Sequence, residues 1–293
     1  MLREPDLGVV LSTWSSDPLL WIGIVVAATL YLAAVRIVDR AHPATRVPSW
    51  RIAAWLSGVA VVALALVSAV HIYAGSVFTV HMAQHLLLAM VAPPLLALGA
   101  PMTLTLRAAS PNLRRSVLLP VLHSWPIKAI SWPPVGWTLF GVVMWATHFS
   151  PLFNASLENQ SLHSAEHLLY LVAGVLFWWP VIGADPIRWR LSPVVRMVYL
   201  AAQMPLNTAV GLAIYFSPTI LYPHYALLGR TWGPDPLTDQ QLAGIVMWGV
   251  GDVILLGALV LAVEAWLRAD EKRSRRTREQ ATHDVERASV EGR

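Results

Sequence analysis

Long apolar runs alternate with short polar segments along the whole chain. The apolar runs cover roughly residues 19–38, 52–73, 79–99, 134–150, 162–182, 194–217 and 240–267. A helix that crosses the hydrocarbon core of a bilayer needs about 20 mostly apolar residues. The pattern therefore predicts an all-α polytopic membrane protein, in which residues 1–267 form one bundle of seven transmembrane helices and residues 268–293 form a charged tail.

Composition agrees with this class. Of the 293 residues, 56% are hydrophobic and 13% are charged, whereas an ordinary soluble domain has about 25% charged residues. No basic stretch leads into a short apolar run near the first residues, so we expect no cleaved signal peptide. The chain has no cysteine, which excludes disulfides and thiolate metal sites.

The basic residues are distributed unequally between the two sides of the predicted bundle. Of the 21 Lys and Arg residues, all but Arg3 and Arg230 fall on one side when seven spans are assumed. Basic residues concentrate on the cytoplasmic side of membrane proteins. We therefore expect the N-terminus outside and the tail in the cytoplasm. Because topology explains the excess of basic residues, we expect no nucleic-acid partner.

Six of the ten histidines lie at the outer ends of the predicted spans: His71, His81, His85, His148, His163 and His167. Titratable side chains at membrane depth are costly and usually face the interior of a bundle. His81 and His85 are four residues apart, as are His163 and His167, so each pair projects from one face of its helix. We predict that the six imidazoles form an outward-facing metal site.

Neighbouring side chains extend this predicted site. Met82, Met144 and Met247 bring thioethers near the histidines, and imidazole combined with thioether suits copper, Cu(I) in particular. Gln84 and Glu166 stand beside the two histidine pairs, where we expect them to orient ring N–H groups.

The last outer loop, residues 217–239, is long and rich in Pro and Gly. It carries His224, a further accessory residue, and we expect it to cover the outer face as a lid. Thr238 with Gln241 three residues later predicts a capping box that opens the seventh helix. Asp252 lies in the middle of that helix, where a carboxylate is either a proton-relay group or a partner for a neighbouring helix.

Structural roles are the alternative reading for single members of this set. A lone histidine at a helix end is most often a satisfied interfacial side chain, and methionines on apolar helices are usually packing residues. Two pairs at helical spacing, with two further histidines on the same side, favour a functional site.

Several short motifs occur in order from the third span to the seventh. They are His81-Met-Ala-Gln-His85, Ala92-Pro-Pro-Leu-Leu-Ala-Leu-Gly-Ala-Pro101, His163-Ser-Ala-Glu-His167, Phe177-Trp-Trp-Pro180, Gly183-Ala-Asp-Pro186, Gln203-Met-Pro205 and Asp239-Gln-Gln-Leu-Ala-Gly244. Together they resemble the CtaG-type cytochrome c oxidase assembly factors associated with caa-type oxidases. The resemblance implies a multi-pass protein of the bacterial plasma membrane that is needed to mature a haem-copper oxidase.

The resemblance and the histidine pattern together predict a membrane copper chaperone. It would take copper from an external donor protein and pass it to the oxidase subunit that carries the binuclear centre. No catalytic nucleophile or phosphate-binding loop is evident, so we predict no enzyme activity. Two alternatives stay open: a haem-binding electron-transfer or quinone-reactive membrane protein, since histidines of two helices can ligate haem, and a metal-free assembly scaffold.

Overall fold

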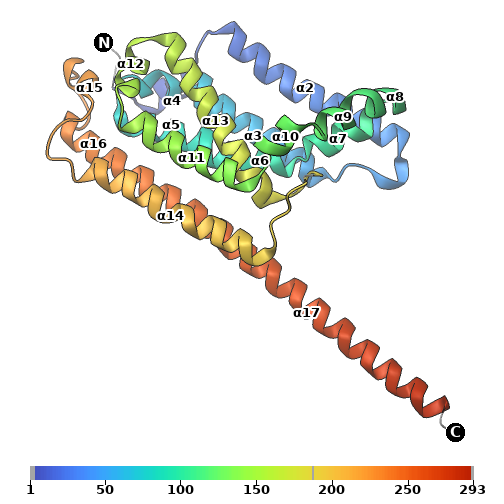
Figure 1. The fold of residues 1–293 in the computed structure, drawn as a ribbon. Coiled ribbons are helices and arrows are strands. Elements are labelled where there is room, and N and C mark those ends of the chain that lie inside the picture. Colours follow the sequence, from blue (N-terminus) through green and yellow to red (C-terminus); the bar gives the residue numbers. More distant parts are fainter. Residues whose placement is uncertain (1–3, 187, 292–293) are drawn as a thin grey trace.

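The chain is all-helical in the computed structural model, which describes residues 4–186 and 188–291 and contains no strand among them (Figure 1). In chain order the elements are α1 (Leu7–Ser12), α2 (Pro18–Ala41), η1 (Pro43–Thr45), α3 (Ser49–Val67), α4 (Ala69–Ala74), α5 (Phe78–Leu86), η2 (Leu87–Val91), α6 (Ala92–Leu98), α7 (Pro101–Ala108), α8 (Pro111–Leu113), η3 (Arg114–Leu118), α9 (Leu119–Leu122), α10 (Trp125–Ile130), α11 (Pro133–His148), α12 (Leu152–Glu158), α13 (Gln160–Ile182), α14 (Pro193–Tyr215), α15 (Pro223–Leu227), α16 (Pro236–Ile245), η4 (Val246–Val250) and α17 (Gly251–Glu291). Arg3, one of the two basic residues expected on the outer side, and the last two residues of the tail lie outside the described residues.

Six helices of the described chain are long and apolar enough to cross a membrane. They are Pro18–Ala41, Ser49–Val67, Phe78–Ala108, Gln160–Ile182, Pro193–Tyr215 and Pro236–Arg275. The run expected at residues 134–150 forms α11, which has only 16 residues and is about 24 Å long, whereas the hydrocarbon core is about 30 Å thick. Length and composition therefore support six of the seven expected spans.

The helices pack as one bundle with α2 at its edge, against α3 and α7 (Figure 1). On the other side, α14 lies beside α16 and α17, and α11 packs between α13 and α14. The long helix α17 continues beyond the bundle into the charged tail. Because successive helices reverse direction, the starts of α5, α13 and α16 and the end of α11 meet at one end of the bundle.

The third span is interrupted where two prolines enter it. Pro93 and Pro94 lack N–H groups, so the helix cannot complete its regular backbone hydrogen bonds there. The π-helical turn η2 ends at Val91, shortly before these prolines. Gly174 of α13 meets this point, because a Cβ at that position would lie 2.5 Å from the Ala89 carbonyl oxygen. Glycine therefore allows α13 to approach the interrupted helix closely.

Two buried aspartates cap the pieces of this third span from other parts of the chain. The Asp239 carboxylate accepts hydrogen bonds from the Phe78 N–H (2.9 Å), the Thr79 N–H (3.0 Å) and the Thr79 hydroxyl (2.6 Å) at the start of α5. Asp185 caps α7 in the same way, through the N–H (2.7 Å) and hydroxyl (2.8 Å) of Thr103. Each carboxylate satisfies N–H groups that the first turn of a helix leaves free.

The capping box expected at Thr238 and Gln241 is wrong. The helix begins at Pro236, and the Asp235 carboxylate accepts from the N–H groups of Leu237 and Thr238, both at 3.1 Å. The Thr238 hydroxyl donates to Asp235 instead of capping the helix itself. An aspartate followed by proline is a strong helix start, because it supplies an acceptor and a proline that needs none.

We expect Asp239→Ala to lower the free energy of unfolding by about 3 kcal/mol, because it leaves one buried and one partly buried N–H group of α5 without an acceptor. It also removes the partner of Arg230, whose Nη2 lies 3.3 Å from Asp239. Thermal unfolding in detergent measures the loss. The matched control is Asp235→Ala, an exposed cap of the adjoining helix, for which about 1 kcal/mol is expected. Equal losses would contradict a special role for the Asp239 contact.

Candidate metal centre

The six predicted histidines lie together at one end of the bundle. His81 and His85 come from α5, His163 and His167 from α13, His148 from the last turn of α11, and His71 from α4. Neighbouring ring centroids within this histidine cluster are 4.2 to 6.3 Å apart. The grouping expected from spacing and depth is thus present in the fold.

Five of these rings are buried, with exposed fractions between 0% for His81 and 8% for His163, and His71 is half-buried. Four ring nitrogens are buried without a hydrogen-bond partner in the described part of the chain: His85 Nδ1, His148 Nε2, His163 Nε2 and His167 Nε2. A buried polar atom without a partner costs about 1–3 kcal/mol. Bare imidazole nitrogens at this density are what a metal ion would satisfy.

The hydrogen bonds of His148 determine which of its nitrogens can bind a metal. Its Nδ1 lies 2.7 Å from the Met144 carbonyl oxygen, so Nδ1 carries the proton and donates it. The lone pair is then on Nε2, the atom that has no partner. Tyr170 supports this arrangement, because its hydroxyl bonds the Thr147 hydroxyl at 2.5 Å and its ring stacks on His85 at 4.0 Å.

His81 and His85 face each other through their Nε2 atoms, which are 2.7 Å apart. His81 Nδ1 lies 3.1 Å from the Tyr225 hydroxyl, which also lies 3.1 Å from the Ala74 carbonyl oxygen. Burial raises the pKa of Tyr225 well above its usual range, so the phenol keeps its proton and donates it to Ala74. Its oxygen then accepts the His81 Nδ1–H, so the lone pair of His81 is on Nε2, where it accepts the His85 Nε2–H, and the bare nitrogen of His85 is Nδ1.

Glu166 belongs to the cluster itself, although we expected it only to orient the rings. One carboxylate oxygen accepts a hydrogen bond from the Ser156 hydroxyl at 2.7 Å, and the other is buried without a partner in the described chain. One ligand atom each from His81, His163 and Glu166 lie within 4.8 Å of one another. A single ion with bonds of about 2.0–2.2 Å can bridge such a set after small side-chain adjustments.

Gln84 donates a hydrogen bond to His71, whereas we expected it to accept one from a ring N–H group. Its amide nitrogen donates to the Ala65 carbonyl oxygen at 2.7 Å and lies 3.3 Å from His71 Nδ1. Because the amide nitrogen is a donor, His71 Nδ1 is the acceptor and the ring proton is on Nε2. Gln84 therefore orients His71 by donating, and it occupies the lone pair that a metal would need.

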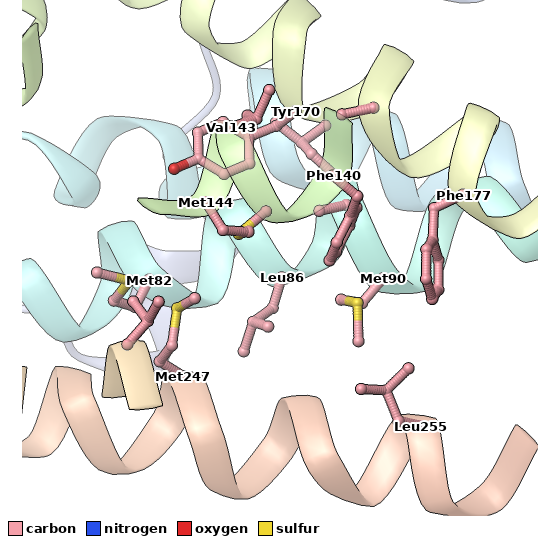
Figure 2. Close-up of a cluster of buried hydrophobic side chains, with 14 of the residues drawn as sticks. Met82, Leu86, Met90, Phe140, Val143, Met144, Tyr170, Phe177, Met247 and Leu255 are labelled. Carbon is pink, nitrogen blue, oxygen red and sulfur yellow. The ribbon is translucent and has the colours of Figure 1, made fainter. Parts of the chain in front are cut away.

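The three methionines of the predicted site have their side chains in the apolar core. Figure 2 shows Met82, Met144 and Met247 among the core residues, together with Leu86 and Phe140. Met144 contributes to the histidine cluster through its carbonyl oxygen, which orients His148. Their positions thus agree with the packing role that was the alternative for methionines.

Asp252 and His224 also have partners outside the histidine cluster. The Asp252 carboxylate accepts hydrogen bonds from the Asn207 amide (3.0 Å) and the Thr208 hydroxyl, so it joins α17 to α14. This arrangement corresponds to the helix-partner alternative. His224 Nε2 lies 3.1 Å from the Gly75 carbonyl oxygen, at the turn between α4 and α5.

The outer loop covers the cluster through two buried tyrosines. Tyr222 donates its hydroxyl proton to the His148 carbonyl oxygen at 3.1 Å, and Tyr225 reaches His81. Gln240 at the start of α16 anchors the loop, since its side-chain oxygen accepts from the Leu221 N–H at 2.7 Å. The expected lid is therefore present, but tyrosines rather than His224 meet the histidines.

Sequence reasoning missed several residues that shape the cluster: Phe153, Ser156, Tyr170 and Tyr222. Phe153 is fully buried, and its ring centroid lies 5.0 to 6.2 Å from those of His81, His85 and His148. A signal existed for Tyr170, which follows His163 and Glu166 by seven and four residues and so shares their helix face. No local pattern marks the loop tyrosines, because their partners are remote in sequence.

A cavity of about 160 Å³ reaches Glu166 from the side of the bundle. It lies between α11, α12 and α13 and is lined by Thr147, Leu152, Ser156, Leu162, Ala165, Glu166 and Leu169. Leu152 and Leu162 are exposed, so the cavity connects the carboxylate with the outer surface of the helices.

Comparisons with known proteins find one matching family and several relatives of this chain. The family model for the cytochrome c oxidase caa3 assembly factor matches residues 29–269. Uncharacterized proteins of Mycobacterium bovis and Mycobacterium tuberculosis are each 32% identical over 292 residues, which cover 96% of this chain and 43% of theirs. One of Mycobacterium leprae is 29% identical over 278 residues, 92% of this chain and 42% of its own. This chain thus spans less than half the length of these relatives. No solved structure matches it.

We expect His167→Leu to stabilise the metal-free protein by about 1 kcal/mol, because it replaces a buried nitrogen without a partner by an apolar side chain of similar size. Asn207→Leu is the control, since that buried amide is hydrogen-bonded to Met247 and Asp252 and its loss is destabilising. Thermal unfolding after treatment with a chelator compares the two. A destabilised His167→Leu protein would mean that the ring nitrogen is satisfied without metal.

Proposed function

This chain belongs to the cytochrome c oxidase caa3 assembly factor family, and we propose that it is a membrane copper chaperone for a haem-copper oxidase. The observation that carries the proposal is the set of four buried histidine nitrogens without partners beside the carboxylate of Glu166. Such a set binds metal well, and copper is here the cargo. The recipient is the oxidase subunit with the binuclear centre, and the source is an external copper donor protein.

The imidazole nitrogens of the cluster are the donor atoms that favour copper. The side chains of Met82, Met144 and Met247 are part of the buried apolar core, so the proposal rests on the imidazoles, and ligation of Cu(I) by a thioether stays a prediction. Imidazole suits copper in either oxidation state, and copper binds most tightly among the divalent first-row metals at a given nitrogen and oxygen site. The affinity of the site for copper exceeds its affinity for zinc and nickel only in part. We therefore propose that the donor protein that docks determines which metal is delivered.

The arrangement of ligands suits transfer better than permanent storage. His81, His163 and Glu166 form one set. His85, His148 and His167 form a second, with ring centroids 6.0 and 6.3 Å from His85 to the other two. More donors are present than one ion needs, so an ion can move between the sets by exchanging one ligand at a time. The cavity beside Ser156 and Glu166 is the side through which we propose that the cargo leaves.

We further propose seven crossings with the histidine cluster on the outer side. The excess of basic residues at the other end supports this orientation. For α11, the support is its position: His148 at its last turn meets His85 and His167, near the starts of α5 and α13. Because α11 begins at the opposite end of the bundle and ends at the histidine cluster, it crosses the same layer as its neighbours, although it has only 16 residues.

The haem alternative finds little support in this geometry. Two axial histidines must leave room for a macrocycle between them. Here the buried Phe153 ring packs among the histidines, with its centroid 5.0 Å from that of His81 and 5.6 Å from that of His148, and so takes up space that a macrocycle would need. The metal-free scaffold is therefore the alternative that experiment must address.

We expect replacing both His81 and His85, or both His163 and His167, by Ala to weaken copper binding by more than about 100-fold. His71→Ala is expected to retain tight binding, because Gln84 occupies its Nδ1 lone pair. Competition with a chromophoric chelator, performed on purified protein that still inserts in the membrane, gives the affinities.

The control for these variants is His42→Ala with His123→Ala, which removes two histidines outside the cluster. Unchanged copper affinity in both double variants would refute the chaperone proposal and leave a scaffold that holds no metal.

Reporter fusions test the proposed topology. A fusion after Arg268 is expected to report the cytoplasm, and fusions after Ile130 and Asn159 are expected to report opposite sides, because they bracket α11. Alkaline phosphatase, active outside, and a fluorescent protein that folds in the cytoplasm provide complementary signals. If the fusions after Ile130 and Asn159 report the same side, α11 does not cross.

A further inference from the structure

A groove opens between the starts of α11 and α14, at the end of the bundle opposite the histidine cluster. Its volume is about 630 Å³. The wall consists of apolar side chains on the two helices, Trp137, Val195, Val198 and Ala202, and two exposed tryptophans, Trp132 and Trp189, stand at the rim. No part of the proposed copper pathway uses this groove.

Two exposed arginines, Arg188 and Arg190, line the same groove. Neither pairs with an acidic side chain within the described residues. The Arg188 guanidinium lies 5.5 Å from the centre of the Trp189 ring, and the Trp189 indole N–H donates to the Lys128 carbonyl oxygen at 3.0 Å. These contacts hold the segment of the two arginines against α10 and beside the apolar wall.

We infer that this groove binds one anionic phospholipid, with its phosphate at Arg188 and Arg190 and an acyl chain along α11 and α14. Charge complementarity selects this occupant: an apolar wall alone would accept any lipid chain, but two uncompensated cations at its end favour an anionic headgroup. Both helices begin at the groove, and their N-terminal ends add partial positive charge. Tryptophans at the rim are typical of the level of the headgroups.

The apolar wall also argues against a small soluble anion as the occupant. Inorganic phosphate would engage the arginines and leave the wall between Trp137 and Ala202 uncovered. A phospholipid covers the wall and neutralises the cations in one molecule. The ligand class is therefore a lipid with a net negative headgroup, such as a phosphatidylglycerol.

Native mass spectrometry of the full chain, extracted in mild detergent and titrated with phosphatidylglycerol or phosphatidylethanolamine of the same chain length, tests the inference. We expect the protein to retain one phosphatidylglycerol in preference. Arg188→Gln with Arg190→Gln is expected to weaken that binding by about 30-fold, the contribution of two cations near a membrane surface, and to leave phosphatidylethanolamine unchanged. The matched control, Arg114→Gln with Arg115→Gln, removes equal charge outside the groove and is expected to change neither.

A second variant separates the wall from the cations. Val198→Trp adds bulk to the apolar wall and keeps both arginines in the chain, and we expect it to weaken phosphatidylglycerol binding at least 10-fold. The inference is overturned if the two double variants lose the lipid equally, if phosphatidylethanolamine binds as tightly as phosphatidylglycerol, or if inorganic phosphate displaces the lipid at equal concentration.

Discussion

The contact between the Asp239 carboxylate and the first turn of α5 is the constraint on which the histidine cluster depends. It joins residues 161 positions apart in the chain, Phe78 and Asp239, and His81 follows Phe78 by three residues. Arg230 balances the buried charge. The next residue of α16, Gln240, holds the outer loop. Two adjacent side chains therefore position both the helix that carries the first histidine pair and the loop that closes over it.

An empty cluster of this kind is costly for the fold. Each buried nitrogen without a partner costs about 1–3 kcal/mol, a large share of the 5–15 kcal/mol by which a typical protein is stable. Binding a metal removes that cost, and releasing the metal restores it. For the proposed chaperone, this cost would hold copper firmly in the absence of a recipient, and release would become favourable only when a recipient supplies new ligands. The same cost of leaving buried nitrogens without partners would disfavour the loss of copper to water.

Much of the fold and the gathering of the six histidines follow from local sequence patterns. Apolar runs of sufficient length predict helices, and the four-residue spacing of His163 and His167 predicts that they share a face. The seven-span count depended on α11, whose 16 residues fall short of the usual length. A pattern tells which face a residue occupies, but not which atoms lie opposite. The role of Glu166 as a candidate ligand therefore required the structure.

The same limit explains why neighbours in sequence were poor guides to the surroundings of each ring. Met144 is one turn from His148, as the sequence shows, yet its carbonyl oxygen orients that ring while its side chain packs in the core. Gln84 adjoins His85 in sequence but contacts His71. Tyr225 reaches His81 from a loop 144 positions away. Tertiary contacts of this kind leave no periodic signal in a single sequence.

The interrupted third span makes the site largely independent of the metal for its shape. Asp239 holds the start of α5, the close approach of Gly174 to Ala89 holds η2 against α13, and Asp185 holds α7 beyond the break. Three contacts from three different parts of the chain thus define where this segment lies before any ligand arrives. A site built in this way spends little binding energy on rearrangement. Within this rigid frame the histidines differ in what their Nδ1 atoms contact: a carbonyl oxygen for His148, the Tyr225 hydroxyl for His81 and no partner in the described chain for His85. Rings held in different ways would release an ion one at a time, which is what the proposed exchange of ligands requires.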